Sequence, residues 1–168
     1  TLLFDLLTVD EELDRANVFD IGLLAQRLAY VTRRLRAGPD TADLRIGYFG
    51  ASTGAAAALW AAAEPNSDIA AVVSRGGRPD LAASRLAEVS APTLLIVGGR
   101  DDAVLELNRE AQSLLRCASR LAVIPGATHL FEEAGALETA AELARDWFIS
   151  HLAPTASRCQ AGGGLHPR

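Results

Sequence analysis

Short apolar runs alternate along this chain with longer segments of helical periodicity, and this alternation limits the fold more than any other feature. Five apolar runs predict strands, over residues 1–6, 44–49, 69–74, 92–97 and 120–124. Helices are expected over 18–36, 55–64, 81–89, 105–117 and 134–152, and a polar loop over 10–17. Continuous apolar strands are typical of sheets buried on both faces, so we expect an α/β fold with three α/β/α layers and a mainly parallel sheet of about five strands.

The length of 168 residues is that of one domain. We assign residues 1–152 to that domain. Residues 153–168 show no periodicity and include three consecutive glycines, so we expect a disordered tail there.

The composition argues against several classes of protein. The net charge of −5 disfavours nucleic acid as a partner, because phosphate binding needs clustered positive charge. No apolar run approaches the length of a membrane span, and no basic leader resembles a signal peptide, so we expect a cytoplasmic protein that does not bind membranes. The chain has no lysine, which excludes lysine-dependent chemistry. Its two cysteines, Cys117 and Cys159, lack metal-ligand spacing, and we expect neither a metal nor an organic cofactor.

Three polar residues follow the carboxyl ends of predicted strands. Ser52 follows the second strand, Asp101 the fourth and His129 the fifth. Ligands of parallel α/β sheets bind at this edge, so the three side chains are expected to converge there. The other histidines lie in the last predicted helix and in the tail.

The segment Gly50-Ala51-Ser52-Thr53-Gly54 fits a nucleophile placed between a strand and a helix. A serine at such a turn needs a strained backbone, and small neighbours let the chain pass closely. We expect Ser52 to be the nucleophile, with the backbone N–H of Thr53 as an oxyanion donor. His129 would accept the serine proton, and Asp101 would orient the imidazole.

Each of these assignments has an alternative. A pentapeptide of this kind also arises by chance, as a plain turn. Asp102 competes with Asp101, although the preceding glycine turn favours the first aspartate. Arg75 and Arg78 follow the third predicted strand and could bind an anionic substrate group, but such arginines more often pair with a nearby carboxylate such as Asp80.

The motifs resemble those of a known family. GYFGASTGAAAAL, PTLLIVGGRDD and IPGATHLFEE are similar to the nucleophile, acid and histidine segments of α/β-hydrolases of the dienelactone-hydrolase-like group. The similarity covers residues 1–152 and is closest to members fused to a phosphoribosyltransferase domain. Dienelactone hydrolase itself uses a cysteine nucleophile, whereas this chain has Ser52. The resemblance therefore implies a serine hydrolase acting on small carboxylic esters or lactones through an acyl-enzyme.

The resemblance also implies that this hydrolase core lacks N-terminal strands. Family members have further strands there, and one, with a loop that gives the second oxyanion N–H, lies between the first and second strands expected here. Either residues 1–6 then pair directly with 44–49, or another chain covers the exposed edge by homodimer formation or strand exchange.

Two other functions compete with hydrolysis. The glycine-rich turn also resembles that of short-chain dehydrogenases, but their Tyr-x-x-x-Lys pair is missing, and Ser74-Arg75 stands where an acid would bind a ribose. A catalytically weak or inactive hydrolase-fold module is the other alternative.

Overall fold

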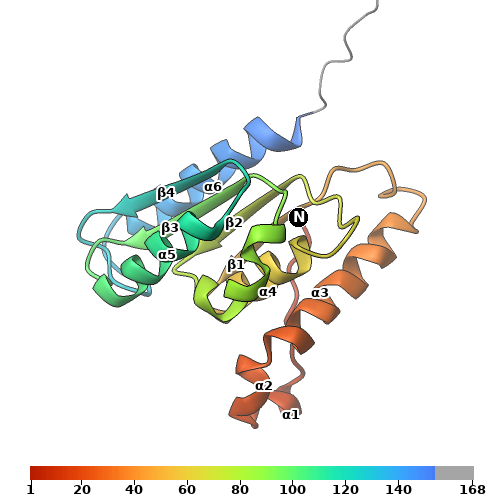
Figure 1. The fold of residues 1–168 in the computed structure, drawn as a ribbon, viewed down its shortest axis with the longest axis horizontal. Helices are drawn as coiled ribbons and strands as arrows, with labels where there is room; N and C mark the ends of the chain where they lie inside the picture. Colours follow the sequence, from red (N-terminus) through yellow and green to blue (C-terminus); the bar gives the residue numbers. More distant parts are fainter. Residues whose placement is uncertain (154–168) are drawn as a thin grey trace, which may run out of the picture.

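Four parallel strands form the sheet and lie side by side in chain order, as the computed structural model shows for residues 1–153 (Figure 1). They are β1 (Gly47–Ala51), β2 (Ala71–Arg75), β3 (Thr93–Gly98) and β4 (Ser119–Ile124). All three neighbouring pairs are parallel. Their carboxyl ends therefore lie at one edge of the sheet, which is where the candidate site forms.

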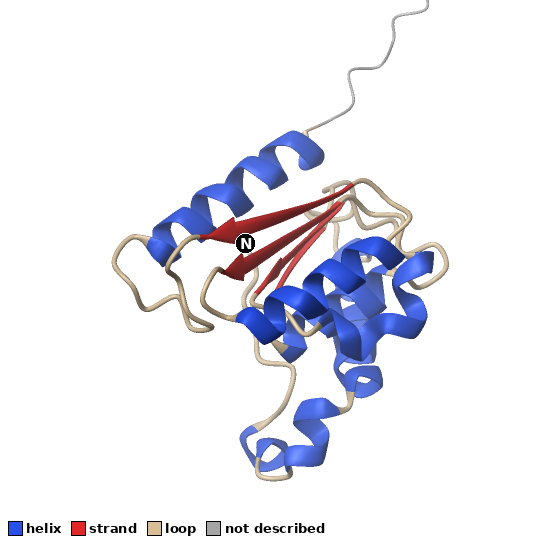
Figure 2. Cartoon of the chain, turned by 60° about the vertical axis from the view of Figure 1, so that its left-hand side comes forward, coloured by secondary structure: helices blue, strands red, loops and turns tan. Residues whose placement is uncertain are grey.

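Within residues 1–153, the sheet is accompanied by six α-helices and one 3-10 helix. They are α1 (Val9–Glu12), α2 (Arg15–Phe19), α3 (Ile21–Arg36), α4 (Thr53–Ala62), η1 (Pro79–Glu88), α5 (Asp102–Leu114) and α6 (Ala136–Leu152). Figure 2 shows α6 on one side of the sheet and the other large helices on the opposite side. The α/β class and the three layers are therefore confirmed.

Two apolar cores lie on the two faces of the sheet. On one face the alanine-rich α4 packs with α3, η1 and the inward side chains of the strands. Leu59 of α4, Leu86 of η1 and Leu95 of β3 are fully buried in this core. On the other face α6 contributes Ala136, Ala140 and Ala144 against apolar side chains of β2, β3 and β4. The small alanine side chains let both helices approach the sheet closely.

Burial along the strands follows their position in the sheet. The central strand β3 is buried at every residue and β2 at all but its last, as the continuous apolar runs predict. The outer strands β1 and β4 alternate between buried and more exposed positions. Strand β1 is an edge strand, since its only partner in the described sheet is β2.

The first predicted strand is not formed. Residues 1–6 have no strand pairing, so the sheet has four strands and not about five. An apolar run becomes a strand only where a neighbouring backbone satisfies its N–H and C=O groups. Here a groove separates residues 1–7 from β1, and the proposed direct pairing of 1–6 with 44–49 is wrong for these residues.

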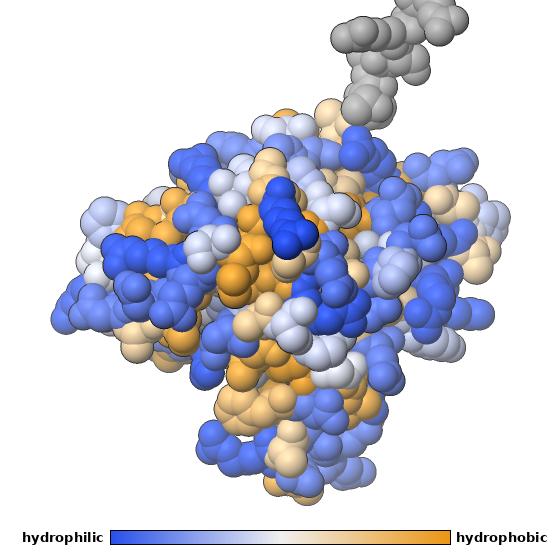
Figure 3. All heavy atoms as spheres, in the orientation of Figure 1, coloured by the Kyte–Doolittle hydropathy of each residue, from blue (hydrophilic) through white to orange (hydrophobic). Residues whose placement is uncertain are grey.

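The predicted polar loop over 10–17 contains the short helices α1 and α2. Thr8 begins α1 with a capping box, in which its hydroxyl accepts from the Glu11 N–H while the Glu11 carboxylate accepts from the Thr8 N–H. Asp14 caps α2 and Asp20 caps α3, so the helix expected from residue 18 begins at Ile21. Apolar atoms reach the surface at this end of the molecule, among polar ones (Figure 3).

Other helix boundaries differ by a few residues. Helix α4 begins at Thr53 and α5 at Asp102, each directly after the turn that carries a candidate site residue. The short helix expected over 81–89 is the 3-10 helix η1. The expected tail, 153–168, lies almost entirely outside the described residues. In the part of the chain that the structure describes, no helix is long and apolar enough to cross a membrane.

Candidate active site

Ser52 lies at the turn between β1 and α4, with a backbone conformation that serine seldom adopts. Its φ is 48° and its ψ is −122°. Such strain costs about 1–3 kcal/mol and persists only where the surroundings enforce it. Here the Ser52 N–H donates to the Arg75 carbonyl at 3.4 Å, and the Ser52 carbonyl accepts from the N–H groups of Ala55 and Arg78, both at 3.1 Å. The Ser52 side chain makes no capping hydrogen bond to α4.

The glycines flanking Ser52 are not equivalent. A side chain on Gly50 would collide with the Gly54 backbone, since a Cβ there would lie 2.6 Å from the Gly54 carbonyl carbon and 2.7 Å from the Ala55 Cα. Outside its own helix, a Cβ on Gly54 would meet nothing within 4 Å. The expected crowding therefore holds at Gly50, while Gly54 has room for a side chain.

Asp101 and His129 are in direct contact. Asp101 Oδ2 lies 2.6 Å from His129 Nδ1. Because an ionised carboxylate only accepts hydrogen bonds, Nδ1 carries the hydrogen in this pair and Nε2 is left as the acceptor. The Asp101 side chain is 16% exposed and the His129 side chain 42% exposed. The competing aspartate, Asp102, is the exposed first residue of α5.

The end of β3 allows the histidine loop to approach Asp101. A Cβ on Gly98 would lie 2.5 Å from the carbonyl oxygens of Ala127 and Thr128, so only glycine lets the loop lie this close. The Arg100 N–H donates to the Ala127 carbonyl at 2.9 Å, and the Asp101 N–H donates to the Gly98 carbonyl at 3.1 Å. These contacts join the acid turn to the loop that carries His129.

The Arg75–Gly76 peptide lies between Ser52 and His129. Ser52 donates to the Arg75 carbonyl, and a Cβ built on Gly76 would lie 3.6 Å from His129 Cε1. Gly76 has a φ of 51° and so suits glycine on conformational grounds as well. No hydrogen bond joins the Ser52 hydroxyl to His129 within residues 1–153. Such bonds often form only when substrate is bound.

The N-terminus of α4 lies directly after Ser52, where an oxyanion donor is expected. Thr53 and Gly54 are the first helical residues, where the helix itself provides no acceptor for the backbone N–H groups. Because the Ser52 side chain does not cap them, these N–H groups are available beside the candidate nucleophile. The helix dipole further favours negative charge at this position.

The two candidate substrate arginines have different surroundings. Arg78 forms a two-pronged ion pair with Asp80, at 2.9 Å from Nε and 2.7 Å from Nη2, and this pairing raises the pKa of Arg78. Arg75 instead places its guanidinium 5.3 Å from the centre of the Phe131 ring. No carboxylate in residues 1–153 forms an ion pair with Arg75. Arg78 therefore forms the structural ion pair with Asp80 that was the alternative to substrate binding. Arg75 does not form this ion pair.

Sequence reasoning missed three residues that support the site. Asn108 of α5 is fully buried and donates to the Gly77 carbonyl at 3.0 Å, in the turn whose Arg78 N–H holds Ser52. Phe131 is buried in a left-handed conformation two residues after His129. The Glu133 carboxylate accepts from the Thr128 N–H. The positive φ of a phenylalanine leaves no signal in a single sequence.

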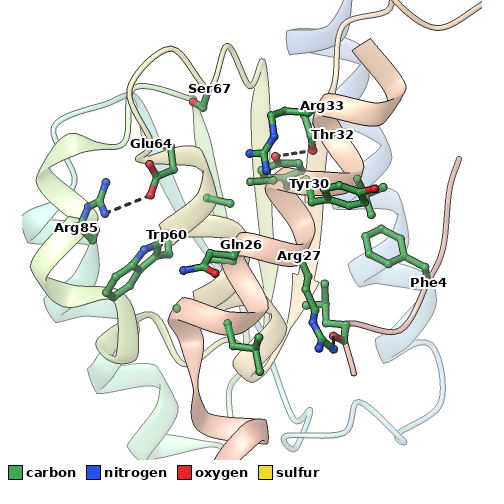
Figure 4. Close-up of a pocket in the computed structure, with 18 of the residues that line it drawn as sticks. Phe4, Gln26, Arg27, Tyr30, Thr32, Arg33, Trp60, Glu64, Ser67 and Arg85 are labelled. Atoms are coloured by element: carbon green, nitrogen blue, oxygen red, sulfur yellow. Dashed lines mark hydrogen bonds and ion pairs between the residues drawn. The ribbon is translucent and has the colours of Figure 1, made fainter. Parts of the chain in front are cut away.

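Two large hollows lie on this molecule, and neither is lined by Ser52, Asp101 or His129. One, of about 1210 Å³, lies between α3 and α4 (Figure 4). Three of the arginines that line it form ion pairs, Arg27 with Glu11, Arg36 with Asp68 and Arg85 with Glu64. The other, of about 1280 Å³, runs along the open edge of β1 and reaches Thr53 and Gly54. Across residues 1–153, no group of three or more His, Cys, Asp or Glu side chains could hold a metal ion.

Comparison with known proteins places this chain in a family. No family model matches the sequence. A solved dienelactone hydrolase from Anabaena variabilis is 56% identical, with a TM-score of 0.83, and the match covers 88% of this chain and 70% of that one. The chain belongs to the dienelactone hydrolase family of α/β-hydrolases. The short-chain dehydrogenase alternative is therefore not supported.

Two longer curated proteins and a more distant solved structure also resemble this chain. Two curated proteins from strains of Mycobacterium tuberculosis, provisionally named phosphoribosyl transferases, are 66% identical over 152 residues. The match covers 90% of this chain but only 34% of each of them, so the chain spans about a third of their length. Their name agrees with the resemblance to hydrolases fused to a phosphoribosyltransferase. Est1E from Butyrivibrio proteoclasticus shares the fold, with a TM-score of 0.67 at 15% identity over 80% of this chain and 71% of that one.

Proposed function

We propose that this dienelactone hydrolase relative hydrolyses small carboxylic esters or lactones, with Ser52 as nucleophile. The observation that carries the proposal is the 2.6 Å contact between Asp101 and His129 at the sheet edge where Ser52 adopts its strained turn. A buried acid that orients a histidine beside an activated serine is the arrangement of acyl-transfer enzymes. The hydrolase fold of the relatives supports the same reaction class.

The residues suggest a two-step reaction. Ser52 Oγ attacks the ester carbonyl carbon while His129 Nε2 takes the hydroxyl proton, and the Thr53 N–H stabilises the resulting oxyanion. The tetrahedral intermediate collapses, the C–O bond to the leaving group breaks, and His129 protonates the leaving alkoxide. Water then attacks the acyl-enzyme with His129 as base, and the second collapse releases the acid and returns the proton to Ser52.

Arg75 is proposed to bind a negatively charged group of the substrate. It ends β2 beside Ser52, and its guanidinium rests on Phe131 of the histidine loop. An arginine without a carboxylate partner offers directional donors to a carboxylate. Arg78 was the other candidate, but its Nε and Nη2 donate to Asp80, which balances its charge. We therefore assign anion binding to Arg75 alone.

A fluorophosphonate probe tests the nucleophile directly. The wild-type chain should be labelled at one residue, Ser52, and should hydrolyse p-nitrophenyl acetate. Ser52→Ala should lose both properties, while Ser74→Ala, which alters a buried serine of β2, serves as the matched control. Labelling that persists in Ser52→Ala would overturn the assignment of the nucleophile.

The second candidate function is that of a weak or inactive hydrolase-fold module. It is favoured by the assignment of a single oxyanion donor, the Thr53 N–H, at the end of α4 that borders the groove along the open edge of β1. Loss of one such donor lowers turnover by about 10²–10³ in other enzymes. A folded wild-type chain that neither reacts with the probe nor hydrolyses the ester would favour this candidate.

A further inference from the structure

The loop that carries His129 has no regular secondary structure, so individual contacts must fix its shape. It runs from the end of β4 to Gly135, the residue before α6. The Phe131 N–H donates to the Thr128 carbonyl at 3.3 Å and closes a turn around His129. Phe131 itself is only 2% exposed and anchors the far side of that turn.

The near side of the turn is held by a carboxylate. Glu133 Oε2 accepts from the Thr128 N–H at 3.0 Å. The pKa of Glu133 is lowered, first by this backbone hydrogen bond, then by the N–H of Glu133 itself and by the Thr128 side chain, while the positive charge of Arg100 adds to the effect. The carboxylate is therefore ionised at neutral pH, and hydrogen bonds to ionised acceptors are stronger than neutral ones.

His129 depends on this support because packing covers its ring only in part. The side chain is 42% exposed, and its hydrogen bond within residues 1–153 is the one to Asp101. The Thr128 N–H belongs to the Ala127–Thr128 peptide, one residue before His129, so a hydrogen bond that holds it restricts the backbone from which the imidazole projects. A shift of about 1 Å in a reacting group can cost about 10²-fold in rate.

We propose that Glu133 is a positioning residue that holds the His129 imidazole against Asp101 by fixing the Thr128 peptide. The expected effect on the rate of ester hydrolysis rests on the proposed function. The position of the His129 imidazole can be measured without any turnover. Glu133 touches no reacting atom in this scheme. The adjacent Glu132 is exposed and, among the described contacts, makes no side-chain hydrogen bond, so it provides a matched control.

Three variants and two readouts test this role. Glu133→Ala should lower kcat for p-nitrophenyl acetate by about tenfold to a hundredfold with KM nearly unchanged. It should also broaden or shift the low-field proton NMR signal of the His129 Nδ1–H. Glu133→Gln keeps an oxygen that can accept from Thr128, so it should retain most of both properties. Glu132→Ala should behave as the wild type.

Two outcomes would overturn the proposal. One is a Glu133→Ala protein with unchanged kcat and an unchanged His129 signal. The other is an equal loss in Glu133→Ala and Glu133→Gln, which would mean that charge or general stability matters and the hydrogen bond does not. If Glu133→Ala fails to fold, Glu133→Asp, which is shorter by one methylene, should show the same selective loss of kcat. If Ser52→Ala hydrolyses the ester as fast as the wild type, the proposed function fails, and the NMR signal still decides the role of Glu133.

Discussion

Asp101 and Asp102 are neighbours in sequence but occupy different places at the site. Asp101 lies 2.6 Å from His129, whereas Asp102 is the exposed first residue of α5. Asp101→Asn should lower kcat for p-nitrophenyl acetate by about 10⁴-fold, because the amide no longer selects the tautomer or stabilises the imidazolium. Asp102→Asn should change the rate little. A larger loss in Asp102→Asn would show that the acid is assigned one residue too early.

The pair Arg75 and Arg78 allows a similar comparison for substrate charge. An anionic ester such as mono-p-nitrophenyl glutarate should be preferred over the neutral p-nitrophenyl valerate. Arg75→Gln should lower kcat/KM for the anionic ester by about tenfold to a hundredfold and leave the neutral ester nearly unaffected. Arg78→Gln should affect both esters equally. An unchanged preference in Arg75→Gln would refute anion binding while leaving the hydrolase function intact.

For single residues, the sequence predicts the positions of the candidate site residues better than the loop contacts that support them. Ser52, Asp101 and His129 could be placed because each follows a strand, and parallel strands end at one edge. Glu133 could not be distinguished from Glu132, since both precede α6 and only the course of the loop brings one of them to Thr128. The roles of all these residues remain predictions.

At the scale of elements, the strands and large helices could be predicted from their periodicity, but the N-terminal segment could not. Residues 1–6 have the apolar character of a strand but lack a neighbouring strand. The helices α1 and α2 depend on capping by Thr8 and Asp14, a signal that the sequence contains and that the polar composition obscures. Secondary structure here is decided by partners and caps as much as by propensity.

The ion pair between Glu11 and Arg27 links α1 to α3. Arg27 donates to both Glu11 oxygens and to the Leu6 carbonyl. The hydrogen bonds from Arg27, and after them the one from the Thr8 N–H, lower the pKa of Glu11 from 4.5 to about 2. A carboxylate with a lowered pKa contributes stability above its unfolded pKa and loses it as pH falls towards the folded value. The contribution should therefore disappear between about pH 4.5 and 2.

Hydrogen exchange measures this contribution locally. Between pH 4.5 and 2, the amides of α1 should lose protection, corrected for intrinsic exchange, before those of α4. Glu11→Gln should show the reduced protection already at neutral pH, and Glu12→Gln serves as the control. Equal protection of α1 in the wild type and Glu11→Gln at neutral pH would mean that the ion pair does not hold this segment.

On the scale of the whole molecule, the edge of β1 has no partner strand among residues 1–153. The Ile46 carbonyl accepts from Ala70, and the Ser52 N–H donates to Arg75, so the even-numbered residues direct their backbone groups towards β2. Backbone direction alternates along a strand, and Gly47, Phe49 and Ala51 therefore present theirs to the groove. Phe49 is also 53% exposed. An edge of this kind is a template for another strand.

We propose that a second copy of the chain covers this edge, with β1 pairing to β1 across a twofold axis. Two copies related in this way would join their sheets and bury the apolar groove between residues 1–7 and β1. Light scattering should then give twice the mass of one chain, with dissociation on dilution. Phe49→Pro should give single chains, because proline removes an outward N–H that β2 does not use.

Phe49→Ala separates backbone pairing from side-chain contact. It keeps the outward N–H and should still form the dimer, although more weakly, whereas Phe49→Pro should not form it at all. Circular dichroism should show the same secondary structure in both variants, since the hydrogen bonds to β2 are untouched. If the wild type is a single chain at its highest soluble concentration, the second copy is not the occupant of the edge. If Phe49→Pro still dimerises, the copies meet through another surface, for which the exposed apolar side chains Val9 and Leu13 are the next to be substituted.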